Sequence, residues 1–362
     1  MGFQRTGRRG CVAGRRQVFA AVFLLAANTH AQNAAPGGTG ARVSQAPMQT
    51  AVEFTDEAGR IVRVPQPVRR IVSLAPSLTE TLFALGAGNL LAGDTDYCDY
   101  PPEALSKPKV GGAINPSIEQ IVALRPDLVL ATKSLNRRET VAALDRLGIP
   151  TYVTDPHTVE AMIASTARLA DVAGVHGAGA ALAASLRERL AALQSRLNGE
   201  PARSVLFVVW TDPLISVGRD TFIADALRWA GARSVVESPQ DWPQISLEGA
   251  LRLQPEFLVF SGEHSEAEQR NLEALAQLPG WRDLDAAHEG RFAVVSEAFI
   301  RPAPRLLYAI EQLARQLHPQ AFLSPPPPEQ KPADAPAKPG LAGQTGSLGA
   351  PRFLEGRAAC AR

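Results

Sequence analysis

Five residues with side chains suited to holding a flat ligand lie just after predicted strands. They are Tyr97, Trp210, Trp242, Phe299 and Arg301. Ligands of open α/β sheets bind where the strands end, so these positions are the first candidates for a site. Trp242 lies between Asp241 and Pro243, directly before a predicted helix start, which is a poor position for a core residue. Aromatic rings placed in this way predict that a flat or bulky ligand is enclosed between them.

Signatures of catalysis are missing from the chain. It contains no phosphate-binding Walker loop, no Gly-x-Ser-x-Gly, no His-Glu-x-x-His and no dinucleotide fingerprint. The histidines of the predicted folded body are scattered without ligand spacing: His157, His176, His264, His288 and His318. A single unpartnered cysteine, Cys98, is typical of a small buried hydrophobe. We therefore predict no catalytic residue, no metal site and no cofactor. An exported enzyme that uses the same cleft is the alternative from another class.

One sequence pattern occurs twice, and it predicts the architecture that positions these residues. Residues 117–132 reappear without a gap as residues 246–261, 129 positions later. Each copy has a serine suited to cap a helix, a glutamate in the first turn, a proline that ends the helix and an apolar strand. This distance is too long for a solenoid, whose period is about 20–50 residues. The pattern predicts two similar α/β lobes, with Glu119 and Glu248 at matching places.

The elements around the two copies favour parallel sheets. Residues 52–64 alternate on both sides of a turn at 56–59, which predicts a β-hairpin. A strand at 70–74 leads into a helix at 78–85, with Ser77 and Glu80 spaced as a capping box. Strands and helices alternate from there to residue 154, and again from 204 to 317, as in sheets flanked by helices. We expect two Rossmann-like lobes with the ligand cleft between them.

A long helical segment separates the two lobes. Residues 158–197 read as nearly continuous helix with a break near 174–179, and residues 180–197 would be about 27 Å long. The apolar stripe on that second part predicts core packing: Leu182, Leu186, Leu190, Leu193 and Leu197. We expect the lobes to be joined by one long rigid helix that packs along both and allows little relative motion.

The N-terminal segment has the features of an export signal. Residues 1–31 contain five arginines, no acidic residue and an apolar run at 18–27 that is too short to span a membrane. We predict cleavage near Ala31 and a periplasmic mature protein. The neighbouring Arg15 and Arg16 leave both the general and the twin-arginine export routes open.

The charge of the mature chain argues against a nucleic-acid partner. Without residues 1–31, 32 Lys and Arg stand against 36 Asp and Glu, which gives no basic surface for nucleic acid. We expect a monomer.

The sequence divides into six predicted parts. They are a signal peptide (1–31), a disordered linker (32–50), an N-terminal lobe (51–157), connecting helices (158–198), a C-terminal lobe (199–322) and a disordered proline-rich tail (323–362).

The chain resembles the periplasmic cobalamin-binding proteins of ABC importers, within the larger group of siderophore- and cobalamin-type binding proteins that have a helical connector. The resemblance covers residues 70–317. It is carried by the segments 71–80, 96–102, 110–112 with 121–129, 242–246 and 301–305. It implies two α/β lobes joined by a long helix, with Tyr97, Trp242, Phe299 and Arg301 as cleft residues and Trp210 as a further candidate.

The resemblance also implies partners. In similar proteins one glutamate on each lobe engages arginines of a homodimeric permease in the inner membrane, and the matching residues here are Glu119 and Glu248. The implied ligand is a corrinoid, cobalamin. Ala113 and Thr132 stand where cobalamin binders often carry further tryptophans, so a ferric siderophore or haem stays open as the ligand.

Overall fold

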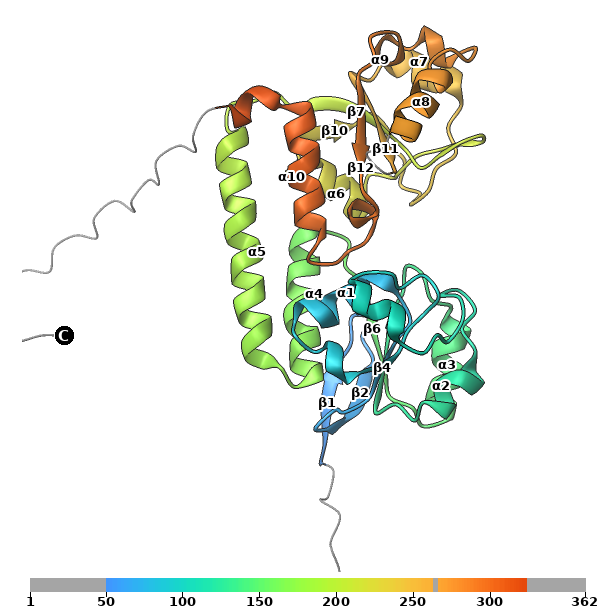
Figure 1. Ribbon diagram of the computed structural model, residues 1–362, viewed down its shortest axis with the longest axis vertical. Coiled ribbons are helices and arrows are strands. Elements are labelled where there is room, and N and C mark those ends of the chain that lie inside the picture. Colours follow the sequence, from blue (N-terminus) through green and yellow to red (C-terminus); the bar gives the residue numbers. More distant parts are fainter. Residues whose placement is uncertain (1–49, 263–265, 324–362) are drawn as a thin grey trace, which may run out of the picture. The chain divides into compact units, whose positions relative to one another are not determined.

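The computed structural model describes residues 50–262 and 266–323, all within one compact unit (Figure 1). Two four-stranded parallel sheets form the centres of two lobes, and a pair of long helices connects them. This confirms the predicted α/β class with two lobes. The predicted signal peptide, residues 32–49 of the linker and residues 324–362 of the tail lie outside the described residues.

The two sheets have the same topology. The first sheet has the order β4-β3-β5-β6 and the second has the order β10-β7-β11-β12, so in each lobe the second strand pairs with the first and the third and fourth follow on the other side. The strands are β3 (Ile71–Ser73), β4 (Leu91–Gly93), β5 (Leu128–Thr132), β6 (Thr151–Thr154), β7 (Arg203–Val208), β10 (Ala232–Ser234), β11 (Phe257–Ser261) and β12 (Phe292–Val295). Identical topology is what the repeated pattern predicts.

Helices cover both faces of each sheet, because alternate strand residues are apolar on both sides. In β7, Val205 and Phe207 pack into one core cluster, and Leu206 and Val208 into another. The helices of the lobes are α1 (Pro76–Ala84), α2 (Ile118–Ala123), α3 (Arg138–Arg146), α6 (Phe222–Trp229), α7 (Leu247–Leu253), α8 (Glu266–Leu275), α9 (Asp285–His288) and α10 (Leu306–Leu317). Each lobe is therefore a three-layer sandwich.

The repeated pattern folds identically in the two lobes. Ser117 caps α2 and Ser246 caps α7, each accepting a hydrogen bond from the backbone N–H three residues later. Both copies then leave the helix through a non-glycine residue with positive φ, Arg125 at 45° and Gln254 at 38°. The lobes therefore match even in the less common backbone conformation at the helix end.

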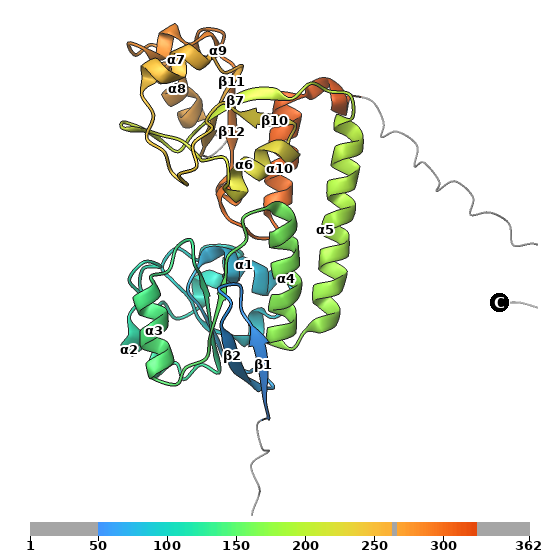
Figure 2. The ribbon, with the colours of Figure 1, turned by 180° about the vertical axis from the view of Figure 1, so that it is seen from behind.

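The predicted N-terminal hairpin is present as β1 (Thr50–Thr55) and β2 (Ile61–Gln66). Buried Asp56 organises the turn, because its carboxylate accepts hydrogen bonds from the backbone and the guanidinium of Arg60. The same carboxylate accepts from the N–H of Val153 in β6, which ties the hairpin to the first lobe (Figure 2).

The connector between the lobes consists of the long helix α5 (His176–Leu197) and a second helix, α4 (Val159–Ala173), beside it. α4 ends at Gly174 in a left-handed conformation, and α5 returns beside it (Figures 1 and 2). The first half of α4 packs in a core cluster of the C-terminal lobe, and its second half packs in a core cluster of the N-terminal lobe. Four leucines of the predicted stripe of α5 are buried, and the fifth, Leu182, is partly buried and packs against the same core. The connector is thus part of both cores, which restrains motion between the lobes.

A glycine allows the two connector helices to pack closely. A Cβ at Gly179 of α5 would lie 2.3 Å from the Cβ of Ala170 in α4, whereas a Cβ at Gly177 would meet nothing within 4 Å. We expect Gly179→Ala to lower the free energy of unfolding by about 1–3 kcal/mol through overpacking. Gly177→Ala should raise it by about 0.5–1 kcal/mol, because alanine favours the helix. Chemical denaturation measures the free energy of unfolding of both variants. An equal change in the two variants would contradict the close packing at Gly179.

No helix within residues 50–262 and 266–323 combines the length and apolar character needed to cross a bilayer.

Candidate functional site

The carboxyl ends of two strands, one in each lobe, meet at the junction between the lobes. β3 leads into α1, whose Glu80 pairs with Arg301 at 3.0 Å, and Arg301 follows β12 and the short helix η4 (Glu297–Ile300). Because all strands of each sheet are parallel, the loops that follow the neighbouring strands lie at the same carboxyl-terminal end of each sheet. We call these two ends, one in each lobe, the facing edges, and they are the candidate ligand site.

Three aromatic side chains on the facing edges are largely exposed. Tyr97 follows β4 and is 65% exposed, Trp210 follows β7 and is 61% exposed, and Trp242 follows β10 and is 53% exposed. Exposed aromatic rings of this size are costly to leave in water and offer flat faces for stacking. The structure thus places three of the five predicted ligand residues where a ligand could reach them.

The loop that carries Trp242 is held in place on both sides. Ser216 donates its backbone N–H to the carbonyl oxygen of Pro243 at 3.0 Å. Gly218 lies so close to this loop that a Cβ there would be 1.8 Å from the carbonyl oxygen of Gln240. The backbone of Trp242 is therefore fixed while its ring stays exposed, which lowers the entropy lost when a ligand binds.

The loop that carries Tyr97 is organised around one lysine. The Nζ of Lys109 donates to the carboxylate of Asp94 at 2.9 Å and to the carbonyl oxygens of Cys98 and Ala104. Asp94 is completely buried, and its Oδ2 has no hydrogen-bond partner among the described residues. Burial raises the pKa of Asp94 to about 6, against the opposing effect of Lys109.

This pKa predicts a pH dependence of stability. Between pH 3.8 and about 6 the folded protein keeps the Asp94 proton that the unfolded chain has lost, so the free energy of unfolding falls as pH rises through this window. The Asp94→Asn variant has no proton to lose in this window. Relative to that variant, the free energy of unfolding of the wild-type protein should fall by at most about 3 kcal/mol across the window. Denaturation curves of both proteins between pH 4 and 7 measure the difference. A constant difference would contradict the raised pKa.

The structure corrects the prediction for Phe299. Its side chain is 0% exposed and stacks on Phe207 with ring centroids 5.8 Å apart, inside the core cluster of the C-terminal lobe. The prediction that it contacts a ligand is therefore wrong. Phe299 packs beneath the facing edge and supports it.

Arg301 also has a role that differs from the prediction. Its side chain is only 13% exposed and pairs with three carboxylates, those of Glu80, Asp99 and Glu297. Arg305 pairs with Glu80 as well, at 2.8 Å. The acids lower the freedom of both arginines, and Arg301 in turn lowers the pKa of Asp99 through their hydrogen bond. Arg301 bridges the lobes instead of pointing freely at a ligand.

Sequence reasoning missed the partners in this cluster. The predicted capping box of Ser77 and Glu80 is wrong, because α1 begins at Pro76 after Ala75, which makes no side-chain cap. Glu80 pairs across the lobes instead. The one signal of this pairing in the sequence was a carboxylate on a strongly apolar helix. An acid in that position is buried, and buried acids are nearly always paired.

Further apolar residues line the edge of the N-terminal lobe. Ile114 and Leu135 are exposed there, whereas Ala113 and Thr132 are buried and present no surface. Buried Asn136 joins these loops, because its Oδ1 accepts from the N–H of Thr132 and its Nδ2 donates to the carbonyl oxygens of Leu74 and Ala113. Positions 113 and 132, where cobalamin binders often carry tryptophans, therefore provide no aromatic ring for a ligand in this chain.

Glu119 and Glu248 lie exposed in the first turns of α2 and α7. The pKa of Glu119 is lowered by a hydrogen bond from its own backbone N–H and by one from Ser117. Glu248 pairs with Arg252 of the same helix, and both side chains are more than two-thirds exposed. Both carboxylates are thus accessible and equivalently placed.

Three other features of the described residues lie outside the candidate ligand site or carry no metal. A cavity of about 620 Å³ lies among α1, α5 and α10, lined by Phe83, Leu186 and Tyr308, and none of the three exposed aromatic residues reaches it. Within the described residues no group of His, Cys, Asp and Glu could hold a metal ion. Cys98 is buried between two threonine hydroxyls, and burial raises the pKa of its thiol.

Comparison with known families identifies the class. Residues 71–298 match the family described as periplasmic binding protein, and the chain belongs to this family. Its members are binding proteins rather than enzymes, and the family name implies that the protein is exported.

Among curated relatives, the vitamin B12-binding protein of Photorhabdus laumondii is 32% identical over 251 residues, which cover 69% of this chain and 88% of that protein. The uncharacterized ABC transporter substrate-binding lipoprotein YvrC of Bacillus subtilis is 27% identical and covers 75% of this chain and 87% of its own.

Solved structures of the same family have a similar fold. The periplasmic vitamin B12 binding protein BtuF of Vibrio cholerae has a TM-score of 0.62 and 28% identity, covering 70% of this chain and 98% of its own. The periplasmic heme-binding protein RhuT from Roseiflexus sp. RS-1 has a TM-score of 0.63 and 26% identity, covering 70% and 99%. The two-lobed fold is thus that of periplasmic binding proteins.

Proposed function

We propose that this protein captures cobalamin in the periplasm between its lobes and delivers it to an ABC importer. The observation that carries the proposal is the placement of Tyr97, Trp210 and Trp242, three exposed rings at the facing edges of two lobes joined through a shared core. A corrin ring is broad and flat, and its apolar faces would cover these rings on binding. Curated relatives named as vitamin B12-binding proteins support the choice of ligand.

Delivery would use the two exposed glutamates. Glu119 and Glu248 occupy equivalent positions of two lobes with the same topology, so the chain has an approximate twofold symmetry. A homodimeric permease has a true twofold axis and would present the same basic site twice. We propose that each glutamate engages one permease subunit. The protein would act as a monomer in this complex.

Haem is the second candidate, and a specific observation favours it. The periplasmic heme-binding protein BhuT has a TM-score of 0.64 and 27% identity, as close as the vitamin B12-binding structure. Ala113 and Thr132 are buried, and the exposed aromatic residues of the loop after β4 are two tyrosines, Tyr97 and Tyr100. The phenol of Tyr97 is an oxygen that could ligate haem iron.

A competition assay distinguishes the two ligands. Trp210 and Trp242 are exposed at the proposed site, so a bound coloured ligand should quench their fluorescence. Cyanocobalamin is expected to quench at low concentration, and haem or a ferric siderophore should not displace it. Displacement of cyanocobalamin by a stoichiometric amount of haem would transfer the proposal to haem.

A further inference from the structure

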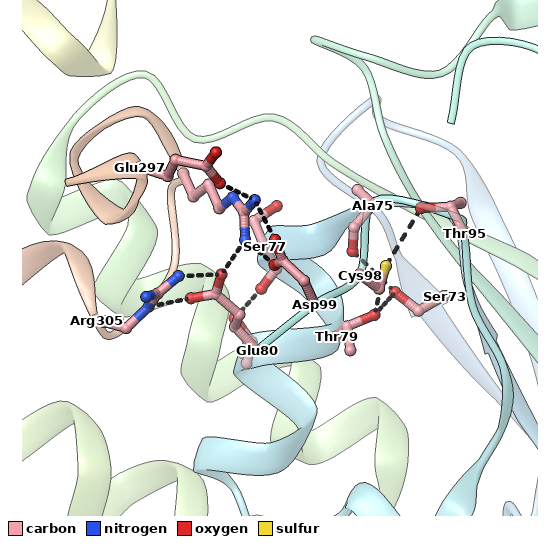
Figure 3. Close-up of polar contacts among 12 residues, drawn as sticks. Ser73, Ala75, Ser77, Thr79, Glu80, Thr95, Cys98, Asp99, Glu297 and Arg305 are labelled. Carbon is pink, nitrogen blue, oxygen red and sulfur yellow. Dashed lines mark hydrogen bonds and ion pairs between the residues drawn. The ribbon is translucent and has the colours of Figure 1, made fainter. Parts of the chain in front are cut away.

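Five charged side chains form one cluster across the junction of the lobes, and we call it the inter-lobe lock. Glu80 and Asp99 come from the N-terminal lobe, and Glu297, Arg301 and Arg305 come from the C-terminal lobe. Figure 3 shows Glu80 of the N-terminal lobe paired with Arg305 of the C-terminal lobe. The pairs that Glu80 and Asp99 form with the arginines join the two lobes, so they exist only while the lobes keep their present separation.

Glu80, at the centre of the lock, is buried, so its energy depends strongly on the position of the two arginines that pair with it. The side chain of Glu80 is 2% exposed and accepts two parallel hydrogen bonds from Arg305, at 2.9 and 2.8 Å, and a third from Arg301. A buried carboxylate without partners is strongly unfavourable, whereas a bidentate guanidinium fixes both distance and orientation. Lobe positions that break these bonds are therefore disfavoured.

The lock continues into the loop that carries a proposed ligand contact. Asp99 accepts a hydrogen bond from Arg301 at 2.7 Å, and Tyr97 lies two residues before it. Between them, Cys98 is held by the hydroxyls of Thr79 and Thr95, each 3.2 Å from its sulfur (Figure 3). Thr79 directly precedes Glu80 on α1. The position of the Tyr97 backbone is thus coupled to the ion pairs.

Arg301 has little capacity left for a ligand. Its Nη1 donates to Glu80 and Asp99, and its Nη2 donates to Glu297 and Asp99. We propose that the inter-lobe lock sets the separation of the facing edges before a ligand arrives, and that Arg301 is a positioning residue for ligand binding rather than a ligand contact. The effect on affinity rests on the proposed function, whereas the effect on lobe separation does not.

The test measures the distance between the lobes in the full exported protein without ligand. Spin labels are placed at exposed positions of the two lobes by Glu139→Cys and Gln277→Cys, with Cys360→Ser to remove the tail thiol. The parent protein should give a narrow distance distribution. Arg301→Met and, separately, Asp99→Asn should broaden it at least twofold. Arg187→Met removes an exposed ion pair with Glu160 between α4 and α5, and should leave it unchanged.

Affinity for cyanocobalamin provides the second readout. If the lock variants keep the binding-competent separation only about a tenth of the time, the apparent Kd rises about tenfold. Arg301→Lys, which keeps the charge, should recover part of this loss. A weaker Kd with an unchanged distance distribution would make Arg301 a ligand contact and overturn the proposal. If the parent protein binds no cyanocobalamin, the proposed function fails, and the distance distribution alone then decides whether the lock exists.

Discussion

Replacing Glu119 and Glu248 together by alanine is expected to abolish ligand uptake by cells while ligand affinity stays unchanged. Both carboxylates are exposed in the first turns of equivalent helices, α2 and α7, and neither takes part in the facing edges. In the proposal their charge serves a contact outside this chain, with a pair of basic sites on the permease. Uptake of labelled cobalamin and calorimetric affinity are measured on the same variant.

A matched control separates docking from helix stability. Glu139 and Glu160 are also exposed acids in first turns, those of α3 and α4, so their replacement by alanine removes the same helix-dipole interaction. The control double variant should transport normally. Equal loss of uptake in both double variants, or loss of ligand affinity in the Glu119 and Glu248 variant, would show that the two glutamates do not form a docking pair.

Trp242→Ala is expected to weaken cobalamin binding by about 1–3 kcal/mol, which corresponds to about 5- to 150-fold in Kd. The ring is 53% exposed on a backbone fixed by its neighbours, so its contact area is available without reorganisation. Trp242→Phe should restore part of the affinity, because it keeps a flat face. Calorimetric titration of both variants gives the values.

The control for this variant is another exposed apolar residue remote from the facing edges. Ile61 of the N-terminal hairpin is 69% exposed, and Ile61→Ala should leave Kd unchanged. If Trp242→Ala binds as tightly as the wild-type protein, the ring lies away from the ligand and the facing edges need another anchor.

Local sequence patterns predicted much of this fold because their physical causes are local. The serine caps at 117 and 246, the hairpin around Asp56 and the alternation in the strands each follow from neighbouring residues. The repeated pattern carried this further, since it predicted two lobes whose sheets have the same strand order.

Long-range pairing accounts for what the sequence could not indicate. Phe299 follows a strand, as ligand residues do, but its burial depends on Phe207, which lies 92 positions away. Glu80 has capping-box spacing with Ser77, yet its partners Arg301 and Arg305 are more than 220 positions away. The packing of the connector could not be indicated for a related reason. A break in the connecting helix near residues 174–179 was predicted, but the return of α5 along α4 brings Gly179 against Ala170, a contact that the local pattern does not show.

The most direct test of the proposed function is calorimetric titration of the exported wild-type protein with cyanocobalamin, and in parallel with haem and a panel of ferric siderophores. The structure and its relatives predict tight binding of one cyanocobalamin per protein, with a negative heat-capacity change from the buried aromatic surface. No heat with cyanocobalamin, together with one-to-one binding of haem or an iron complex, would contradict cobalamin as the ligand.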